Sequence, residues 1–312
     1  MLKAITSITK KYPATIGVGV GGLILQLAFS AWWIMTMIGL SNATSQKVLS
    51  SSGSYALFVY TLFTFYWTSQ VIINGVHITV SGVFATFYFR GVAQPNGDVD
   101  VPVKNPTAAA LKRACTTSLG PNCYGSLLIA IIQTLKALAD NARADGDQDN
   151  ICCTIILCCI SCILAMMRDL LEYFNKYAFA QVAIYGKDYC TAAKDTWELA
   201  KARGIDAIIN DNLIGSVLGM GGLFIGLFTA GTASLYVYLD SSIQKTLAVY
   251  LIVGFAALMI GIVEFSVLSS VIDSGVVTTF VCLAEDPMAL AQTKPALYQK
   301  IQQVYPQVVL GF

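Results

Sequence analysis

Charged residues are scarce in this sequence of 312 residues. Asp, Glu, Lys and Arg make up only 12% of it, and 56% of the residues are hydrophobic, whereas ordinary soluble domains carry roughly 25% charged residues. This composition excludes a soluble globular domain and indicates an integral membrane protein. The formal net charge is +1 and no stretch is dense in Lys and Arg, so nucleic acid is not expected as a partner.

The groupings of residues that carry enzyme or metal chemistry are also missing. The chain has one histidine, no phosphate-binding glycine loop and no nucleophile beside a base, so we predict no enzymatic activity and no cofactor. Nine cysteines are present, but the pair Cys159 and Cys162 has no second pair or histidine at zinc spacing, which argues against a metal site. Five cysteines fall close together, and we expect them to be buried small hydrophobes, with palmitoylation as the alternative: Cys152, Cys153, Cys158, Cys159 and Cys162.

Long uncharged runs make up much of the sequence. Residues 55–89 contain no Asp, Glu, Lys or Arg, and about 20 apolar residues suffice to cross a bilayer core. We therefore expect this segment to be tilted, bent near Gly75, or broken into two embedded pieces. The other predicted spans are 14–40, taken as a retained span rather than a signal peptide, then 114–138 (interrupted early by Gly120-Pro121), 151–167 (marginal), 213–239 and 246–283. The predicted fold class is all-α, a polytopic transmembrane helical bundle of about six membrane segments plus interfacial amphipathic helices.

The loop charges predict which side of the membrane each segment faces. Lys112-Arg113 ends the polar loop after residue 90, and the segment 168–212 holds the largest basic concentration, so both are expected in the cytoplasm. Part of 168–212 has the pattern of a helix lying at the interface, and the tail 288–312 is also assigned to the cytoplasm. Asn42 begins a glycosylation sequon in the polar loop 41–54, which gives weak support for an outside location.

Polar side chains recur along residues 55–89 at helical spacing. Trp67, Gln70, Asn74, His77 and Ser81 are separated by three or four residues, which places them on one side of a helix. A hydrogen-bonding group left unpartnered in hydrocarbon costs several kcal/mol, so this stripe must face other helices or a cavity. Its polar groups could line a polar path or hold helices together, and His77 could couple to protons or be a neutral, bonded ring.

Two acids lie well inside a predicted span. An ionised acid at mid-membrane costs at least about 2.5 kcal/mol, so neither is expected to face lipid unpartnered. We expect Glu264 to lie opposite the polar stripe and to be the first candidate for binding a cation, with a protonated, bonded acid as the alternative. Asp273 is expected nearer the cytoplasmic mouth. In the preceding span, small residues at steps of three and four predict a tight helix-packing face: Gly215, Gly219, Gly222, Gly226 and Ala230.

Three sequence blocks resemble the choline transporter-like family, most closely its fungal members. The blocks are Tyr66–Phe89 (YWTSQVIINGVHITVSGVFATFYF), Asn175–Trp197 (NKYAFAQVAIYGKDYCTAAKDTW) and Phe280–Pro287 (FVCLAEDP). The residues that fall on the family pattern include Asn175, Cys190, Lys194, Asp195, Cys282 and Asp286. The resemblance covers nearly all of this chain, but members of the family are usually longer, so the chain is similar to their C-terminal part.

The resemblance implies a solute carrier that moves choline or a related amine by alternating access in the plasma membrane of a eukaryote, with an endomembrane as the alternative. Its partners would be membrane lipids and the small cationic solute, and the oligomeric state stays open. A quaternary cation is held by aromatic faces and a nearby carboxylate. The substrate-binding candidates are Trp67, Tyr66, Gln70, Asn74, His77, Glu264 and Asp273. The alternatives are a membrane scaffold or lipid-interacting protein that does not transport, and a truncated fragment that is inactive alone.

Overall fold

The computed structural model describes residues 2–48, 50–93, 99–145, 151–203, 206–240 and 246–304. Within these ranges the chain is almost entirely helical, which confirms the all-α fold class. The helices are α1 (Leu2–Lys11), α2 (Ala14–Ser45), α3 (Ser51–Arg90), α4 (Pro106–Cys115), α5 (Leu119–Asp145), α6 (Ile151–Tyr185), α7 (Tyr189–Arg203), α8 (Asp206–Leu239), α9 (Leu247–Glu285), α10 (Pro287–Thr293) and α11 (Pro295–Val304). Two short strands, β1 (Val92–Ala93) and β2 (Val99–Asp100), pair antiparallel after α3.

Five helices of the described part of the chain are long and apolar enough to cross a membrane: α2, α3, α5, α8 and α9. The predicted span 151–167 forms the first half of α6, which is not among these five. The predicted start of the span 114–138 is wrong, because α4 ends at Cys115 and a turn precedes Leu119. Gly120 and Pro121 do not interrupt α5, since they occupy its first turn, where a missing backbone N–H costs nothing.

The organising helix α3 is continuous. It starts where the Ser50 hydroxyl accepts a hydrogen bond from the Gly53 N–H and ends at Arg90. Of the three alternatives for residues 55–89, the break into two embedded pieces is therefore wrong. Gly75 stays helical and faces α5, where a methyl group on its Cα would lie 3.5 Å from the Asn122 amide. The polar loop predicted at 41–54 is shorter than expected, because α2 extends to Ser45 and α3 starts at Ser51.

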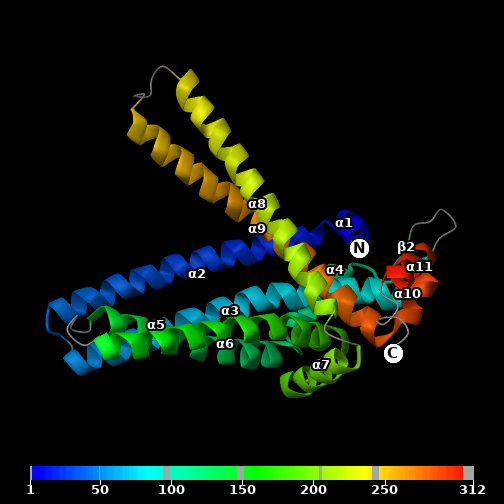
Figure 1. Ribbon diagram of the computed structural model, residues 1–312, viewed down its shortest axis with the longest axis horizontal. Coiled ribbons are helices and arrows are strands. Elements are labelled where there is room, and N and C mark those ends of the chain that lie inside the picture. Colours follow the sequence, from blue (N-terminus) through cyan, green and yellow to red (C-terminus); the bar gives the residue numbers. More distant parts are fainter. Residues whose placement is uncertain are drawn as a thin grey trace.

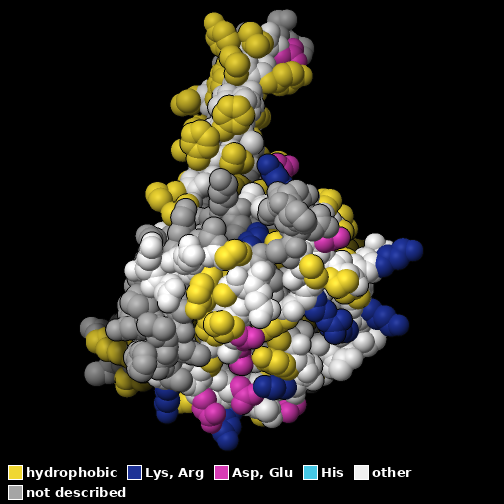
Figure 2. Space-filling model, turned by 90° about the vertical axis from the view of Figure 1, so that its right-hand side faces the viewer, with side chains coloured by type: hydrophobic (Ala, Val, Ile, Leu, Met, Phe, Trp, Pro, Cys, Tyr) yellow, Lys and Arg dark blue, Asp and Glu magenta, His cyan; other side chains and the backbone are white. Residues whose placement is uncertain are grey.

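The helices form a long bundle from which one hairpin projects (Figure 1). α3 contacts α2, α4, α5, α6 and α9, and is therefore the central helix. α8 packs mainly against α9, and together they leave the bundle on the α2 side (Figure 1). Figure 2 shows hydrophobic side chains covering this projecting hairpin. α9 joins the bundle at its C-terminal part and contacts α1, α2, α3 and α6.

The best-packed core lies where α3 and α9 end. Phe84 of α3 and Val271 of α9 are fully buried there beside Ile5 of α1. Gly275 allows the close approach, because a Cβ at this position would lie 2.6 Å from the Phe84 ring. This packed end fixes the part of α9 that faces the polar stripe of α3.

Candidate functional site

The polar stripe of α3 faces its neighbouring helices, as predicted, and its polar groups from Trp67 to His77 find partners there. The buried Ser81 hydroxyl has no partner among the described residues. The Trp67 indole N–H donates to the Cys123 carbonyl at 3.0 Å. The Asn74 amide donates to the Ser126 hydroxyl at 2.9 Å, so both contacts reach α5. Buried polar groups that are bonded in this way hold helices together.

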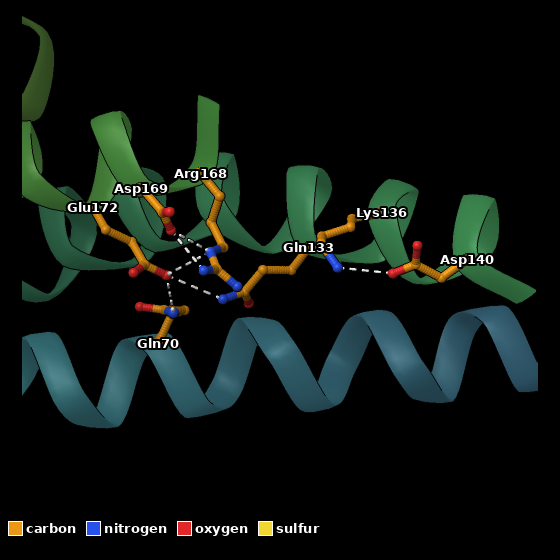
Figure 3. Close-up of polar contacts among 7 residues, drawn as sticks. All are labelled: Gln70, Gln133, Lys136, Asp140, Arg168, Asp169 and Glu172. Atoms are coloured by element: carbon orange, nitrogen blue, oxygen red, sulfur yellow. Dashed lines mark hydrogen bonds and ion pairs between the residues drawn. The ribbon is translucent and has the colours of Figure 1, made fainter. Parts of the chain in front are cut away.

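Gln70 contacts an acid that sequence reasoning missed (Figure 3). Glu172 Oε1 accepts hydrogen bonds from Gln70 at 3.3 Å and from Gln133 at 3.2 Å, which ties α6 to α3 and α5. Arg168 lies 4.0 Å from the same oxygen, but its shorter contact, 2.6 Å, is with Asp169. Glu172 was overlooked because it falls in the basic segment 168–212, whose first part in fact continues α6 through the bundle.

His77 joins three helices. Its Nε2 is 2.9 Å from the Lys176 carbonyl and its Nδ1 is 2.8 Å from the Ser274 hydroxyl. A carbonyl can only accept, so Nε2 carries a proton and donates to Lys176. The one Ser274 hydroxyl proton is within reach of both His77 Nδ1 and the Ser270 carbonyl at 2.8 Å, so Nδ1 accepts in a neutral ring and donates in a protonated one. The side chain is 8% exposed. The ring is therefore bonded across helices, and its neutral state stays a prediction.

Beside His77 an ion pair borders a cavity. Lys176 Nζ of α6 lies 2.8 Å from Asp273 Oδ2 of α9. The side chain of Lys176 is 42% exposed and that of Asp273 is 22% exposed. The adjoining cavity has a volume of about 500 Å³ and lies between α6, α8 and α9. Its other lining residues are small, hydroxylated or apolar: Gly215, Leu218, Gly219, Gly222, Leu223, Ile262, Phe265, Ser266, Ser269 and Ser270.

The glycine stripe of α8 explains the shape of this cavity. Gly222 and Gly226 lie against Phe265 and Ile262 of α9, as the packing prediction requires. A Cβ at Gly215 or Gly219 would meet no atom within 4 Å. The prediction of one continuous packing face is therefore wrong at these two positions, which instead leave open space beside Asp273.

The predicted position of Glu264 is also wrong. Glu264 lies exposed on the part of α9 that has left the bundle, and within the described residues it has no hydrogen-bond or ion-pair partner. Asp273 and Ser274, nearly three turns further along α9, reach the interior instead. The half-buried Tyr66 and Trp67 do not line the cavity, so the structure does not bring the candidate aromatic residues and Asp273 together.

The family-pattern residues of the second block build the joint between α6 and α7. The Asn175 amide donates to the Gly125 carbonyl at 3.2 Å, and its oxygen accepts from the Tyr189 hydroxyl. Burial raises the pKa of Tyr189 to about 12. Asp195 pairs with Lys187 at 2.6 Å across the turn between the two helices.

The turn itself requires a glycine, since Gly186 has a φ of +69°. Asp188 then caps α7 by accepting the Thr191 N–H at 2.9 Å, and this bond lowers the pKa of Asp188. Cys190 and Lys194 lie on the exposed side of α7, where Lys194 is 3.9 Å from Glu198. The buried side of α7 is formed by Tyr189, Ala192 and Thr196, and the position of this helix at the membrane interface stays a prediction.

The third block closes the packed end of the bundle. Cys282 is fully buried next to Tyr88. The Asp286 carboxylate caps α10 by accepting a hydrogen bond from the Met288 N–H at 2.9 Å. The backbone carbonyl of Asp286 accepts one from the Tyr88 hydroxyl at 2.9 Å. These family-pattern positions thus organise the joint between α3, α9 and α10.

Two further predictions concern the outer surface. Asn42 is exposed near the end of α2, and its glycosylation stays a prediction. Cys158, Cys159 and Cys162 are exposed on α6, so the prediction that they are buried is wrong. The side chains of Cys152 and Cys153 lie outside the described residues, and palmitoylation of the cluster stays a prediction.

Comparisons with known proteins agree with the three sequence blocks. The family model described as "Plasma-membrane choline transporter" matches residues 1–288. The Protein PNS1 of Mycosarcoma maydis is 40% identical over 100% of this chain and 59% of its own length. That of Cryptococcus neoformans is 38% identical over 100% of this chain and 58% of its own length. A CTL-like protein of Dictyostelium discoideum is 36% identical over 98% of this chain and 52% of its own length.

The chain therefore spans somewhat more than half the length of these curated relatives. Its membrane helices fit the integral membrane, transporter-like character of the matched family. The match extends over the whole bundle, including the cavity beside Asp273. The chain belongs to the choline transporter-like family.

Proposed function

We propose that this chain takes part in moving choline or a related amine across the plasma membrane by alternating access, and that the cavity between α6, α8 and α9 receives the cation. The observation that carries the proposal is the Asp273 carboxylate at the wall of that cavity. Within the described residues, the charged groups that line the cavity are Asp273 and Lys176. An acid so placed can balance the charge of a bound cation.

The chemistry of the cavity suits a small quaternary amine. Its volume of about 500 Å³ is within the roughly 300–1,000 Å³ of typical small-molecule sites. Phe265 offers an aromatic face to a methylated nitrogen. The hydroxyls of Ser266 and Ser270 donate to backbone carbonyls of their own helix, so their oxygens stay free to accept a hydrogen bond from a substrate hydroxyl.

Lys176 acts in this proposal as an internal substitute for the substrate. It pairs with Asp273 at 2.8 Å, and in this proposal an incoming cation takes its place. The exchange keeps the Asp273 carboxylate paired in both states. The charge that it leaves unpaired is the Lys176 ammonium, whose side chain is 42% exposed. A quaternary amine donates no hydrogen bond from its nitrogen, whereas the Lys176 ammonium does. Lys176 can therefore pair with Asp273 again and help to release the substrate.

The α8–α9 hairpin supplies an element that can move. It contacts the bundle mainly through the last part of α9, whereas its outer part packs on itself. Rocking of one packed unit against another around a central site is a common route to alternating access. In this proposal the hairpin closes over the cavity on one side of the membrane and opens it on the other.

Uptake of radiolabelled choline into proteoliposomes that contain the purified chain tests the proposal. We expect saturable uptake, a strong loss in Asp273→Asn, and near-normal uptake in the matched acid variant Glu264→Gln, because Glu264 lies outside the cavity. Thermal unfolding of each variant controls for folding. Absence of saturable choline uptake and binding would refute the substrate, and equal loss in both variants would refute the site.

A second function, a membrane scaffold that does not transport, is favoured by one observation. The described polar groups of the α3 stripe from Trp67 to His77 are all bonded within the protein, as expected of side chains that only join helices. A stable, folded chain that neither binds nor transports choline in the same assay would support this alternative.

A further inference from the structure

A second cavity lies at the end of α3, away from the proposed cation site. It has a volume of about 370 Å³ and is bordered by residues of α3, α4 and α6. Arg90, Lys112 and Arg113 all line it, and all three are exposed. It shares no lining residue with the cavity beside Asp273.

Among the described residues, none of the three cations has an acidic partner. Every acid that forms an ion pair in the described part of the chain is paired with another Lys or Arg, including nearby Asp100, which contacts Lys11 at 3.4 Å. Three like charges around one hollow repel each other unless an anion joins them. The cavity is therefore suited to an anionic ligand.

Local packing brings these charges together. α4 lies close to α3 at Gly82, where a Cβ would be 3.1 Å from the Ala110 methyl and 3.4 Å from the Arg113 guanidinium. Ala110 and Ala114 are buried in this contact, so the last turn of α4 presents Lys112 and Arg113 beside it. Arg90 is the last residue of α3, where a long cationic side chain of a membrane helix reaches the headgroup region.

Apart from Thr86, the rest of the cavity wall is apolar. Ala85, Phe89 and Ile184 line it next to the cations. A free phosphate ion would use the charges alone, whereas a phospholipid would also place its glycerol and first methylene groups on these side chains. Basic pockets between membrane helices with such walls bind phosphate headgroups.

We propose that this cavity binds the phosphate headgroup of an anionic membrane phospholipid, with Arg90, Lys112 and Arg113 holding the phosphate and Phe89 and Ile184 contacting the start of the acyl chains. The site couples the C-terminal end of α3 to the lipid composition of the leaflet around it. It is independent of the proposed transport of a cation.

Binding of three probes to the purified chain in uncharged detergent tests the site. The probes are dioctanoyl phosphatidic acid, dioctanoyl phosphatidylcholine and inorganic phosphate, measured by calorimetry. The pocket variant is Arg90→Gln/Arg113→Gln, with Lys112→Gln as a milder second variant. The matched control is Lys47→Gln/Arg143→Gln, which removes two exposed cations at the opposite end of the bundle (Figure 1).

We expect phosphatidic acid to bind more tightly than the other two probes. Each cation removed from the pocket should weaken this binding roughly fivefold, so the double variant loses about 25-fold, while the control stays within about twofold. Equal affinity for inorganic phosphate would assign the site to a free anion and overturn the lipid proposal. Equal affinity for phosphatidylcholine, or equal losses in pocket and control variants, would also overturn it.

Discussion

The α3-centred bundle and the α8–α9 hairpin are built from similar apolar sequence but are held together differently. More than half of the apolar window of α3 is buried, 56%, against 17% for α8 and 6% for α9. In the bundle, side chains such as Asn74, His77 and Asn175 hydrogen-bond across helices. The outer hairpin relies on glycine contacts and on the Thr229 hydroxyl, whose one proton is shared between the Ala257 carbonyl of α9 at 2.9 Å and the Gly226 carbonyl of α8 at 2.8 Å.

This difference suggests a division of labour within the proposed transporter. Hydrogen bonds between helices fix register and direction, so the bundle is suited to be a rigid frame. Glycine contacts allow helices to slide or rock without breaking directional bonds. α9 belongs to both regions, and the ion pair Lys176–Asp273 lies where it passes from one to the other.

The largest expected contrast is between two equal substitutions in the two regions. Gly125→Ala places a methyl group 2.5 Å from the Tyr189 ring and 2.6 Å from the Phe179 ring in the packed bundle. We expect a loss of about 1–3 kcal/mol in unfolding free energy. Gly219→Ala meets open space and should be neutral or stabilising by up to about 1 kcal/mol. Denaturant unfolding in detergent measures both, and similar losses would remove the contrast between the regions.

The next effect concerns the joint between α6 and α7. Asn175 is 1% exposed and bonds both Gly125 and Tyr189, so Asn175→Ala leaves buried polar groups unpaired. We expect a loss of about 1–3 kcal/mol, towards the lower end because the Tyr189 hydroxyl can reorient. Lys194→Ala, whose side chain is 75% exposed, is the control and should change the unfolding free energy by less than about 0.5 kcal/mol. An equally small effect of Asn175→Ala would contradict its structural role.

A smaller effect is expected inside the hairpin. Thr229→Val removes the hydrogen bond to Ala257 of α9, and such bonds between membrane helices average about 0.6 kcal/mol. Thr232→Val is the control, since its hydroxyl bonds only within α8, to the Thr229 carbonyl. Spin labels on α8 and α9 should report a wider spread of distances in Thr229→Val than in the control. An unchanged distribution would mean that this bond does not hold the hairpin closed.

The smallest effect is the pH dependence of the α7 cap. The pKa of Asp188 is lowered by the bond from the Thr191 N–H, below the ordinary value of about 3.9. The charged cap therefore stabilises the fold above about pH 4, and the stabilisation is lost as the pH falls through the folded-state pKa. The thermal midpoint of Asp188→Ala should lie slightly below that of the parent at neutral pH, and the two should converge under acidic conditions. A gap that persists at low pH would contradict this assignment.

The sequence predicted well those features that follow from periodicity. The length and charge of the apolar runs indicated the membrane helices, and the spacing from Trp67 to His77 placed the stripe on one interior side of α3. Partners across helices could not be predicted in the same way, because they depend on how two helices are rotated against each other. The bonds from His77 to Ser274 and from Gln70 to Glu172 join residues far apart in the chain.

The choice between the two acids of α9 shows where sequence reasoning stopped. Glu264 is nearer the middle of its apolar run, and that position favoured it as the cation ligand. Along the chain, α9 enters the bundle only after Glu264. Glu264 is therefore exposed, and Asp273 borders the cavity. Lys176 falls in a segment that was predicted to be cytoplasmic or interfacial. Nothing in the basic sequence around it indicates that it pairs with an acid of a membrane helix.

The exchange at Asp273 is the central claim of this account, and equilibrium binding of radiolabelled choline to Lys176→Gln tests it most directly. Because this substitution removes the internal competitor 2.8 Å from the carboxylate, choline should bind the folded variant more tightly than the parent, and Asp273→Asn should abolish the gain. Unchanged or weaker binding by Lys176→Gln would contradict the proposed exchange.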